Sequence, residues 1–541
     1  MNVLNYYFSM QIIIPMSGIG KRFIDSGYTT PKPLIIVDGK PIIQHVINLF
    51  PNETNVKFIC NNVHLEKTNM RNILCNICPS GEIYEVPLEN RKGPVHAVSM
   101  IFDDIDDHEE VIVSYCDYSS YWGYENFLKD IKEKNAHGAI ACYRGFHPHM
   151  LNGDNYAFVR EKKHGSKVVD AIQEKQPFTN NKMSEYASNG TYYFKTGAIM
   201  KHYFQKLMDL NLQINNEYYV SMVYNLMIED GLNVNIFEIE HMLQWGTPDD
   251  LENYRSWSKY FNNIMQKQTI YNDKNNTTTV LPLAGRGSRF SQQGYALPKP
   301  LIEVNDKPMV VEAIRCLPQS KNNVFICMDK YLNEYSLGKK IKQYYPDSKI
   351  FGIDGVTEGQ ACTAEHGITE SNMNLDNPIL ITACDNGVYY NVEKYESLVN
   401  DTTNDVIVWS FRNEPTSKNN PNMYAWMETD ENDFVKRVSC KQFNEEFHDV
   451  KNSHVIIGTI FFRKAKYFIE GLQKNYQANI KTNDEFYVDD VINQNIKSGL
   501  KIKVFEVENY ICWGTPDDYE TFLYWQNFFH KCSWHPYIKT K

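Results

Sequence analysis

Short apolar runs alternate along the chain with stretches in which apolar residues recur at helical spacing. In the first half, the runs Ile12–Ile14, Val56–Cys60 and Val111–Tyr115 predict buried strands. The segments Pro41–Phe50 and Tyr124–Lys134, which lie between these runs or after them, predict helices. Such alternation is typical of a mostly parallel sheet with helices on both faces, so the sequence predicts an α/β fold. Ligands bind such sheets at the carboxyl ends of the strands.

The second half repeats this pattern at a nearly constant offset. Arg22 and Arg289 are 267 positions apart (289 − 22), and Trp245 and Trp513 are 268 positions apart (513 − 245). An offset that changes so little indicates a duplication of whole domains rather than of a local motif. The chain of 541 residues is also too long for one hydrophobic core. We therefore expect two tandem Rossmann-like, three-layer α/β domains with mostly parallel mixed sheets.

The polar, unpatterned stretch Asn275–Thr279 indicates a join between the two copies. We expect a first domain at residues 10–261, a linker at 262–277 and a second domain at 278–541. Met1–Ser9 precede the first predicted strand and are interpreted as an extension.

Composition narrows the class of protein. Hydrophobic residues make up 42% of the chain and charged residues 22%, as in ordinary globular proteins. A net charge of −11 argues against a nucleic-acid partner, which would favour a basic face. No apolar run reaches the length of a membrane span, and the first ten residues lack the basic region and cleavage site of a signal peptide. Cys60 and Cys327 lie within apolar runs, as buried free thiols do, so we expect a cytoplasmic protein without membrane contact.

Each copy has a glycine-rich loop after its first predicted strand. The loops read Gly18-Ile19-Gly20-Lys21-Arg22 and Gly285-Arg286-Gly287-Ser288-Arg289, and a Pro-Lys-Pro follows each of them. Glycines let backbone N–H groups approach an anion, and arginine and lysine supply positive charge. One such loop alone is more often structural, but its repetition together with the basic residues predicts a phosphate-binding site in each copy.

An aspartate ends a buried strand in each copy, at Asp117 and Asp385. A carboxylate at this edge of the sheet can hold Mg²⁺ against a phosphate, because hard oxygen ligands suit that ion. The alternative interpretation is a capping or turn residue, which is the commoner role of an isolated aspartate after a strand. The residues alone leave both interpretations open.

These stretches resemble the signature of sugar-1-phosphate nucleotidyltransferases, which runs Gly-x-Gly-x-Arg, Pro-Lys-Pro-Leu and Gly-Lys-Pro. The last element is Gly39-Lys40-Pro41 in the first copy and Asp306-Lys307-Pro308 in the second. The resemblance covers nearly all of both copies and is strongest to the branch found in capsule and surface-polysaccharide loci. It implies a tandem enzyme of GT-A-like nucleotidyltransferase fold that uses Mg²⁺.

The resemblance also implies roles for individual residues of the nucleotide half of the site. The catalytic and metal-binding set would be Arg22, Lys32, Asp117, Arg289, Lys299 and Asp385, with Asp117 and Asp385 as the metal ligands. The nucleotide-binding set would be Ser17, Gly18, Gly20, Gly93, Ala284, Gly285, Gly287 and Gly359.

A third group of residues resembles the family's sugar-phosphate half-site, and it comprises Lys175, Gly190, Glu217, Lys441, Gly458 and Glu485. The alternative interpretation is an exposed lysine and a helix-start acid in each copy. The two copies are not equivalent here, because Glu174 precedes Lys175 whereas Cys440 precedes Lys441.

Two further segments depart from the family pattern. Many members carry a metal-binding aspartate where this chain has Gln244 and Cys512, so a second metal ligand is in doubt. The segments that read the base in the family, 91–97 and 357–363 here, differ from each other and from the usual pattern. The two copies are therefore expected to bind different nucleotides, unless one copy has lost its reaction.

The predicted function is nucleotidyl transfer from an NTP to a sugar 1-phosphate or a similar phosphorylated alcohol, with release of pyrophosphate, for polysaccharide or glycan biosynthesis. Two alternatives stay open. A GT-A-type glycosyltransferase would carry Asp-x-Asp at the strand end, where this chain has Asp117-Tyr118-Ser119 and Asp385-Asn386-Gly387. In the other alternative, one copy is catalytic and its partner copy is regulatory. Contact between the domains and assembly into a homo-oligomer are also left open.

Overall fold

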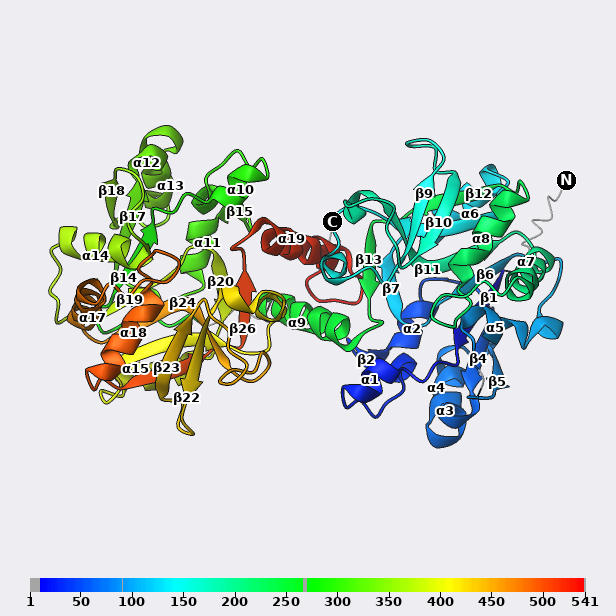
Figure 1. Cartoon of the computed structure of the whole chain (residues 1–541), viewed down its shortest axis with the longest axis horizontal. Coiled ribbons are helices and arrows are strands. Elements are labelled where there is room, and N and C mark those ends of the chain that lie inside the picture. Colours follow the sequence, from blue (N-terminus) through cyan, green and yellow to red (C-terminus); the bar gives the residue numbers. More distant parts are fainter. Residues whose placement is uncertain (1–9, 90, 266–269, 540–541) are drawn as a thin grey trace. The chain divides into compact units, whose positions relative to one another are not determined.

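A computed structural model describes residues 10–89, 91–265 and 270–539 (Figure 1). Contacts divide the chain into two compact units. The first comprises the described residues up to Lys259 together with those from Tyr524 onward, and the second is Tyr260–Leu523. The expected extension Met1–Ser9 and residues 266–269 of the expected linker lie outside the described residues.

The first unit contains a sheet of nine strands, with the main order β10-β9-β11-β6-β1-β4-β5 and with β8 joining β11 to β12. These strands are β1 (Gln11–Met16), β4 (Asn55–Asn61), β5 (Glu82–Val86), β6 (Val111–Ser114), β8 (Gly138–Tyr143), β9 (Ala157–Glu161), β10 (Val169–Glu174), β11 (Tyr186–Phe194) and β12 (Val234–Glu238). Strand β1 runs parallel to β4 and β6, whereas β11 runs antiparallel to β6 and β8. The expected mixed, mostly parallel core of the sheet is therefore confirmed.

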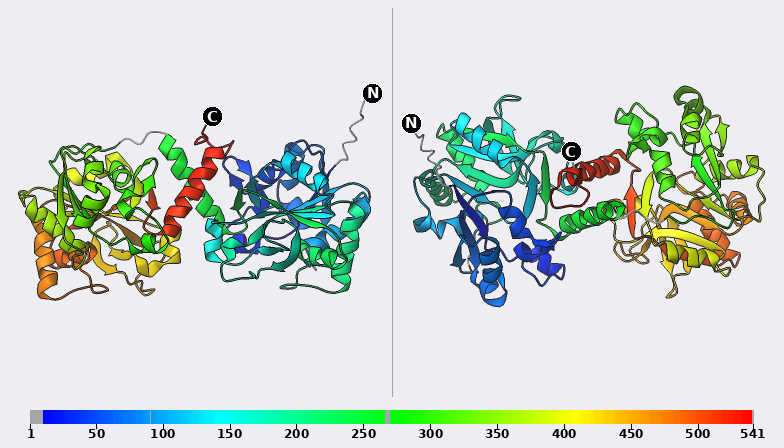
Figure 2. Two further views of the ribbon diagram at one scale, coloured as in Figure 1. Left: turned by 90° about the horizontal axis from the view of Figure 1, so that it is seen from above. Right: turned by 180° about the vertical axis from the view of Figure 1, so that it is seen from behind.

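Helices cover both faces of this sheet, as Figure 2 shows. The helices that begin in this unit are α1 (Lys21–Asp25), α2 (Ile42–Ile47), α3 (Asn62–Lys67), α4 (Met70–Ile77), α5 (Pro94–Ser99), α6 (Tyr124–Glu133), α7 (Gly197–Asp209), α8 (Val220–Glu229) and α9 (Pro248–Met265), and α9 continues past Lys259. Alternate residues of β1 enter different cores, since Ile12 and Ile14 belong to one buried cluster and Ile13 to another. Two apolar layers on one sheet give the three-layer α/β architecture expected from the sequence.

The second unit has the same plan, with the main strand order β18-β17-β14-β19-β24-β21-β25 and with β22 and β23 beyond β24. Its strands are β14 (Thr278–Leu283), β17 (Asn322–Met328), β18 (Lys349–Ile353), β19 (Ile379–Ile381), β21 (Val406–Phe411), β22 (Ala425–Thr429), β23 (Val435–Cys440), β24 (His454–Phe462) and β25 (Ile502–Glu506). The helices that begin in it are α10 (Ser288–Gln292), α11 (Met309–Arg315), α12 (Asp329–Tyr335), α13 (Leu337–Lys342), α14 (Gln360–Glu370), α15 (Val392–Asn400), α16 (Pro415–Asn419), α17 (Ala465–Gln477), α18 (Val488–Lys497) and α19 (Pro516–Lys531), and the part of α19 from Tyr524 onward belongs to the first unit. The duplication seen in the sequence is thus a duplication of topology.

A two-stranded ribbon follows the central strand in each unit. It pairs β7 (Tyr118–Tyr121) with β13 (His241–Gln244) in the first unit and β20 (Asn386–Tyr389) with β26 (Asn509–Cys512) in the second. The remaining short pairs are β2 (Ile36–Val37) with β3 (Lys40–Pro41) and β15 (Glu303–Val304) with β16 (Lys307–Pro308). The ribbons bring the end of β13 or β26 next to the strand-end aspartate.

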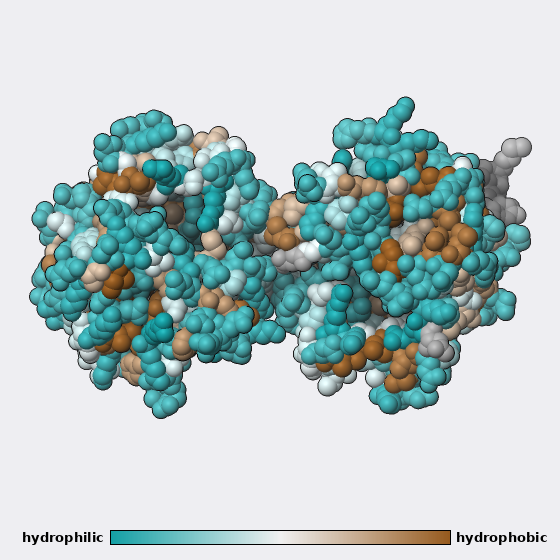
Figure 3. Space-filling view, viewed as in Figure 1, coloured by the Kyte–Doolittle hydropathy of each residue, from teal (hydrophilic) through white to brown (hydrophobic). Residues whose placement is uncertain are grey.

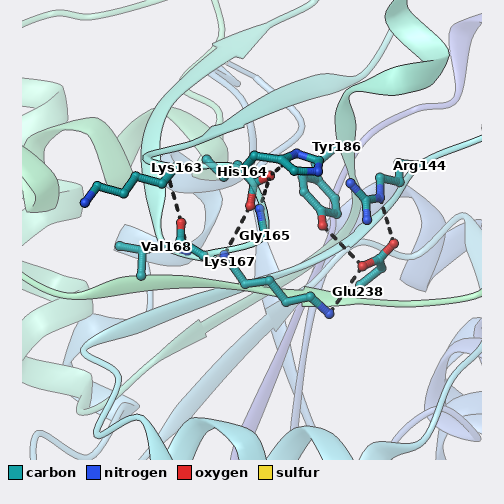
Figure 4. A network of polar contacts seen from close by, with 10 residues as sticks. Arg144, Lys163, His164, Gly165, Lys167, Val168, Tyr186 and Glu238 are labelled. Atoms are coloured by element: carbon teal, nitrogen blue, oxygen red, sulfur yellow. Dashed lines mark hydrogen bonds and ion pairs between the residues drawn. The ribbon is translucent and has the colours of Figure 1, made fainter.

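A polar network closes the far edge of the first sheet (Figure 4). The Glu238 carboxylate on β12 accepts hydrogen bonds from Arg144 Nε at 2.9 Å and from Tyr186 Oη at 3.2 Å, and it pairs with Lys167 Nζ at 3.2 Å. The second unit keeps the pair of Arg412 with Glu506 at the corresponding edge.

Hydrophilic residues predominate on the face of each unit seen in Figure 3.

The segment from Tyr524 onward lies with the first unit, although the repeat suggested a second domain reaching residue 541. Tyr524 Oη donates to Met242 O at 2.6 Å, and the His535 ring lies 3.1 Å from Ser258 O. Trp525 packs edge-on against Tyr254. The aromatic residues of this segment are covered by the first unit, which sequence matching between the copies does not reveal.

Candidate active site

The glycine loop of each unit passes directly over the lysine of Pro-Lys-Pro. Gly20 and Gly287 adopt left-handed backbone conformations, with φ of 69° and 58°, at the start of α1 and α10. A Cβ on Gly20 would lie 3.5 Å from Lys32 Cβ, and a Cβ on Gly287 would lie 3.2 Å from Lys299 Cβ. Glycine at these positions permits both the backbone conformation and the close approach.

Side chains of neighbouring elements, strand β4 in the first unit and helix α12 in the second, hold the loops in place. Asn61 Nδ2 donates to Ser17 O at 3.0 Å in the first unit. In the second unit Tyr331 Oη donates to Arg286 O at 3.1 Å, next to Gly285 and the buried Ala284. A Cβ on Gly18 or Gly285 would meet no atom within 4 Å, so these two loop positions face open space.

Lys32 and Asp117 form an ion pair where the central strands end, with Nζ and Oδ2 2.7 Å apart. Lys299 pairs with Asp385 in the same way, and Lys299 Nζ also donates to Gly514 O at 3.1 Å. Burial lowers the pKa of each lysine, but the charge of the paired aspartate outweighs burial and the pKa is raised. Burial likewise raises the pKa of Asp385, but the Lys299 ammonium brings it below its usual value. Both units therefore hold a charged lysine and a carboxylate at the predicted phosphate site.

Two cavities of the first unit meet at this pair. The loop cavity, of about 260 Å³, is lined by Ser17, Gly18 and Gly93 among others. The acceptor cavity, of about 390 Å³, is lined by the remaining predicted residues of this unit. Both cavities are lined by Gly20, Lys32, Tyr115, Asp117, Glu217 and Tyr219. The structure thus brings the predicted nucleotide and sugar-phosphate residues of the first unit to two sides of one ion pair.

Arg22 lines the acceptor cavity, close to the Lys32–Asp117 pair. Its counterpart Arg289 has Nη2 3.6 Å from the Met423 sulfur, a weak acceptor. The contact with the Met423 sulfur is weak and would not hold Arg289 against an incoming phosphate.

The predicted sugar-phosphate residues of the first unit form a hydrogen-bonded chain. Lys175 Nζ donates to Tyr219 Oη at 2.6 Å, and Tyr219 Oη donates to Glu217 Oε2 at 2.5 Å. Gly190 has φ of 97°, and a Cβ there would lie 3.1 Å from the Tyr115 ring. In the sequence, Tyr219 stands out only as one of the aromatic residues after Glu217 that could pack against a sugar ring, and Tyr115 only as the end of an apolar run.

In the second unit Lys441 Nζ donates to Met423 O at 2.6 Å and lies 5.3 Å from the centre of the Tyr487 ring. Burial, followed by the charge of Glu485, raises the pKa of Tyr487. Gly458 again has a positive φ, of 81°, and a Cβ there would lie 3.5 Å from Ala383 Cβ. Lys441, Glu485 and Gly458 thus occupy the same elements as their counterparts.

Gly93 and Gly359 lie against the segments that carry the sugar-side acids. A Cβ on Gly93 would lie 2.8 Å from Tyr218 N, and a Cβ on Gly359 would lie 2.5 Å from both Phe486 N and Phe486 O. Backbone hydrogen bonds join the same segments, from Tyr218 N to Lys92 O at 2.8 Å and from Phe486 N to Glu358 O at 2.8 Å. These glycines therefore allow the loop segments at Gly93 and Gly359 to lie close to the segments that carry Glu217 and Glu485.

The donor set of the first unit fits Mg²⁺. From the place that a Cβ on Gly246 would take, Asp117 Oδ2 is 3.1 Å away and the Gln244 amide is 2.9 Å away. Within the described residues, no three His, Cys, Asp or Glu side chains gather as a metal cluster. Mg²⁺ is commonly held by one or two carboxylates together with substrate phosphates and water, so the Asp117 carboxylate suits it. The nearer atom of Gln244 is the amide nitrogen Nε2, so Gln244 would offer its oxygen to the ion only after its amide group turns over.

The corresponding donor set of the second unit suits Mg²⁺ less well. The Cys512 sulfur and Asp385 Oδ2 lie 3.2 Å and 3.4 Å from the place of a Cβ on Gly514. Burial raises the pKa of the Cys512 thiol, and the Asp518 carboxylate adds to the shift. A neutral thiol is a poor ligand for a hard cation, so Asp385 is the main donor in this unit.

Comparison with known proteins gives the class of the first unit. Residues 11–232 match the family model described as nucleotidyl transferase. The matched segment covers most of the first unit but less than half of the chain. The bifunctional protein GlmU of Buchnera aphidicola subsp. Baizongia pistaciae is 24% identical over 233 residues, which are 42% of this chain. The matched part spans 47% of that relative's length.

Solved structures of about half the length of this chain are also similar to it. The nucleoside-diphosphate-sugar pyrophosphorylase from Vibrio cholerae RC9 is 23% identical, covers 45% of this chain and 98% of its own, and gives a TM-score of 0.38. The inositol-1-phosphate CTP transferase from T. maritima is 12% identical, covers 50% of this chain and 100% of its own, and gives a TM-score of 0.37. Separately, none of the described helices combines the length and apolar character needed to cross a membrane.

Proposed function

We propose that the protein transfers a nucleotidyl group from an NTP to a sugar 1-phosphate or a similar phosphorylated alcohol and releases pyrophosphate. The observation that carries this proposal is the meeting of the loop cavity and the acceptor cavity at Lys32 and Asp117. A reaction that joins two phosphorylated substrates requires two pockets with positive charge between them. The nucleotidyl transferase match over residues 11–232 supports the same reaction class.

In this mechanism the loop at Gly18 and Gly20 binds the triphosphate, and the acceptor phosphate enters beside Lys175. An oxygen of the acceptor phosphate attacks the α-phosphorus, a new P–O bond forms, and the bond between the α-phosphorus and the bridging oxygen to pyrophosphate breaks. Both substrates arrive as phosphate anions, so no side chain needs to act as a nucleophile or take a proton. Catalysis then consists of positioning and neutralising charge.

The side chains divide this work by their places in the cavities. Lys32 faces both cavities and would neutralise charge that develops between the substrates. Arg22 lines the acceptor cavity beside the Lys32–Asp117 pair and would neutralise phosphate charge there, and the family resemblance supports a further role in stabilising the leaving pyrophosphate. Asp117 and Gln244 would hold Mg²⁺, which when bound supplies further charge neutralisation for the phosphates.

The second unit keeps Arg289, Lys299 and Asp385, and we propose that it carries out the same class of reaction. The alternative that one unit only binds a nucleotide is favoured by a single observation, the thiol of Cys512 in place of an oxygen donor. A role in polysaccharide or glycan biosynthesis and a cytoplasmic location are parts of the proposal that the family resemblance supports. Assembly into a homo-oligomer stays a prediction.

The test is a screen for pyrophosphate release by the full chain. Four NTPs are each paired with glucose 1-phosphate, N-acetylglucosamine 1-phosphate and inositol 1-phosphate in the presence of Mg²⁺. Asp117→Ala reports the second unit alone and Asp385→Ala the first. Loss of one set of products in each variant supports two reactions, whereas no release above background from the unaltered chain in any pairing overturns the proposal.

A further inference from the structure

A helix is clamped onto the acceptor-side strand in the same register in both units. Asn225 on α8 accepts from Ile172 N and donates to Ile172 O, each at 2.9 Å. Asn493 on α18 makes the same two bonds, both 2.9 Å, with Val438. The two bidentate clamps make α8 on β10 and α18 on β23 directly comparable.

This register decides which side chains meet at the end of the strand. Two residues after the clamped residue lie Glu174 in the first unit and Cys440 in the second. One helical turn before each asparagine lie Ser221 and Asp489. In the first unit Ser221 Oγ donates to Glu174 Oε2 at 2.6 Å, so the strand position and the helix position are in contact.

Each unit therefore has one carboxylate and one small side chain at these two positions, but on opposite elements. In the second unit the Cys440 thiol is hydrogen-bonded to Asp490, the residue after Asp489 on the helix. The first unit has the acid on the strand and the hydroxyl on the helix. The second unit has the thiol of Cys440 on the strand and the acid of Asp489 on the helix. When the sequences of the two copies are matched, Cys440 takes the position of Glu174. The match therefore shows only that the second copy lacks this glutamate.

The surroundings of the two acids are also alike. Burial raises the pKa of Glu174 and that of Asp489, the latter to about 6, and in each case the charge of the neighbouring lysine opposes the shift. That lysine is Lys175 for Glu174 and Lys441 for Asp489, and each lies over a tyrosine, at 4.5 Å and 5.3 Å from the ring centre. The group of acid, lysine and tyrosine is thus present in both units.

We propose that Asp489 replaces Glu174 in the second unit, and that this unit has a complete acceptor site for a phosphorylated, hydroxyl-bearing molecule. Asp489 would accept hydrogen bonds from acceptor hydroxyls and would position Lys441 for the acceptor phosphate. This inference rests on the proposed function. The replacement of Glu174 by Cys440 could be taken as a sign that the second unit has lost its acceptor site. Asp489 would supply the acid that this unit otherwise lacks.

The test is a reciprocal exchange in the full chain. In the Asp117→Ala background, Asp489→Ser raises the KM of the best acceptor among the three sugar or inositol phosphates about tenfold or more, since a hydrogen bond to a charged group is lost. The KM of the NTP stays within about twofold, because the change lies on the acceptor side. Adding Cys440→Glu restores the acceptor KM to within about threefold of its starting value. An unchanged acceptor KM in Asp489→Ser, or no rescue by Cys440→Glu, overturns the proposal.

The matched control is Asp490→Asn, one residue further along the helix. Asp490 accepts hydrogen bonds from Thr482, at 2.8 Å, and from the Cys440 thiol, and asparagine can accept both. This control removes the same charge from the same turn of α18, and the acceptor KM is expected to stay within about twofold. A loss equal to that of Asp489→Ser would mean that charge alone is responsible, and would overturn a specific role for Asp489.

A second measurement needs no activity. Cys440→Glu places a further carboxylate beside Asp489 and Asp490, so it lowers the Tm by several degrees, and the loss is smaller in Asp489→Ser, where one of the neighbouring charges is absent. Equal effects in the two backgrounds would show that residues 440 and 489 are not in contact, and would overturn the proposal. Failure of the proposed function appears separately, as the absence of pyrophosphate release from the unaltered chain.

Discussion

The two units share the lysine–aspartate pair at the end of their central strands but differ in the side chains around it. In the first unit an amide, Gln244, lies beside the aspartate, and in the second a thiol, Cys512, takes that place. The proposed acceptor acid is Glu174, on a strand, in the first unit and Asp489, on a helix, in the second. Groups that would face the reacting phosphates are therefore the same, whereas groups that would select the metal and the acceptor have changed. This division suggests that duplication preserved the reaction and altered its partners.

The most direct test of whether the two units share one reaction is to remove the strand-end aspartate from one unit at a time. Asp117→Ala and Asp385→Ala should each abolish one set of products, with a loss of about 10³-fold in kcat/KM, because each removes the carboxylate that would hold the metal and orient the lysine. Pyrophosphate release with separate substrate pairs measures this loss.

A variant that retains near-normal turnover of its own products would exclude the shared reaction. Glu53→Gln serves as a control, because Glu53 lies away from the site and accepts a hydrogen bond from Tyr124.

The spacing between nucleotide and acceptor sides provides a second comparison. Gly359→Ala should destabilise the second unit by about 3 kcal/mol, and Gly93→Ala should destabilise the first unit by somewhat less. The added Cβ would clash with backbone atoms, and both positions have a positive φ that alanine rarely adopts. The contacts would be 2.5 Å for Gly359 and 2.8 Å for Gly93. Chemical denaturation of the full chain measures both.

The matched control for these glycines is Gly499→Ala, with φ of 80° and no atom within 4 Å of the added Cβ. It should cost only about 1 kcal/mol, from the backbone conformation alone. Equal destabilisation by Gly359→Ala and Gly499→Ala would show that close packing at Gly359 is unimportant.

The metal donors offer a smaller and more specific test. Cys512→Asp should lower the Mg²⁺ concentration needed by the second unit about tenfold, since a second carboxylate replaces a neutral thiol. Gln244→Asp should have a weaker effect of the same sign, because an oxygen donor is already present there. Activity titrated against Mg²⁺ gives both values. Cys316→Asp is unsuitable as a control, because the Cys316 thiol packs against the core. Cys75→Asp, at an exposed position, is the suitable control.

The smallest expected effect concerns pH. The pKa of Asp489 is raised from 3.8 to about 6 by burial. The folded chain therefore binds a proton more tightly than the unfolded chain, and this contribution to stability is present below pH 4 and is lost as the pH rises to about 6. Asp489→Asn should accordingly raise the Tm at pH 7.5 by more than it does at pH 4. A gain of the same size at both values would contradict the assignment of this shift.

The sequence predicted most of the fold because its signals are local. Apolar runs such as Val56–Cys60 and Val111–Tyr115 became central strands, and the glycine loops follow the first strand of each unit. The family resemblance led to residues that the structure gathers in the first unit, although their roles stay predictions. Domain limits at 261 and 278 also stay predictions.

Other features depend on contacts between distant segments, and the sequence did not reveal them. Asp489 could not be matched with Glu174 because the repeat aligns helix with helix and strand with strand, whereas the exchange runs between them. The antiparallel strand β11 at the centre of the first sheet was also not foreseen, since alternating strands and helices suggest parallel neighbours.

The aromatic segment from Tyr524 onward has a practical consequence for dividing the protein. Expression of residues 10–261 alone would leave Tyr254, Met242 and Ser258 without the side chains that cover them, and the exposed surface would favour aggregation. A gene cut at the repeat boundary would thus encode a first enzyme that lacks its own covering. Coexpressing a peptide of residues 524–539, or fusing it after residue 265, would supply that covering in trans or in cis.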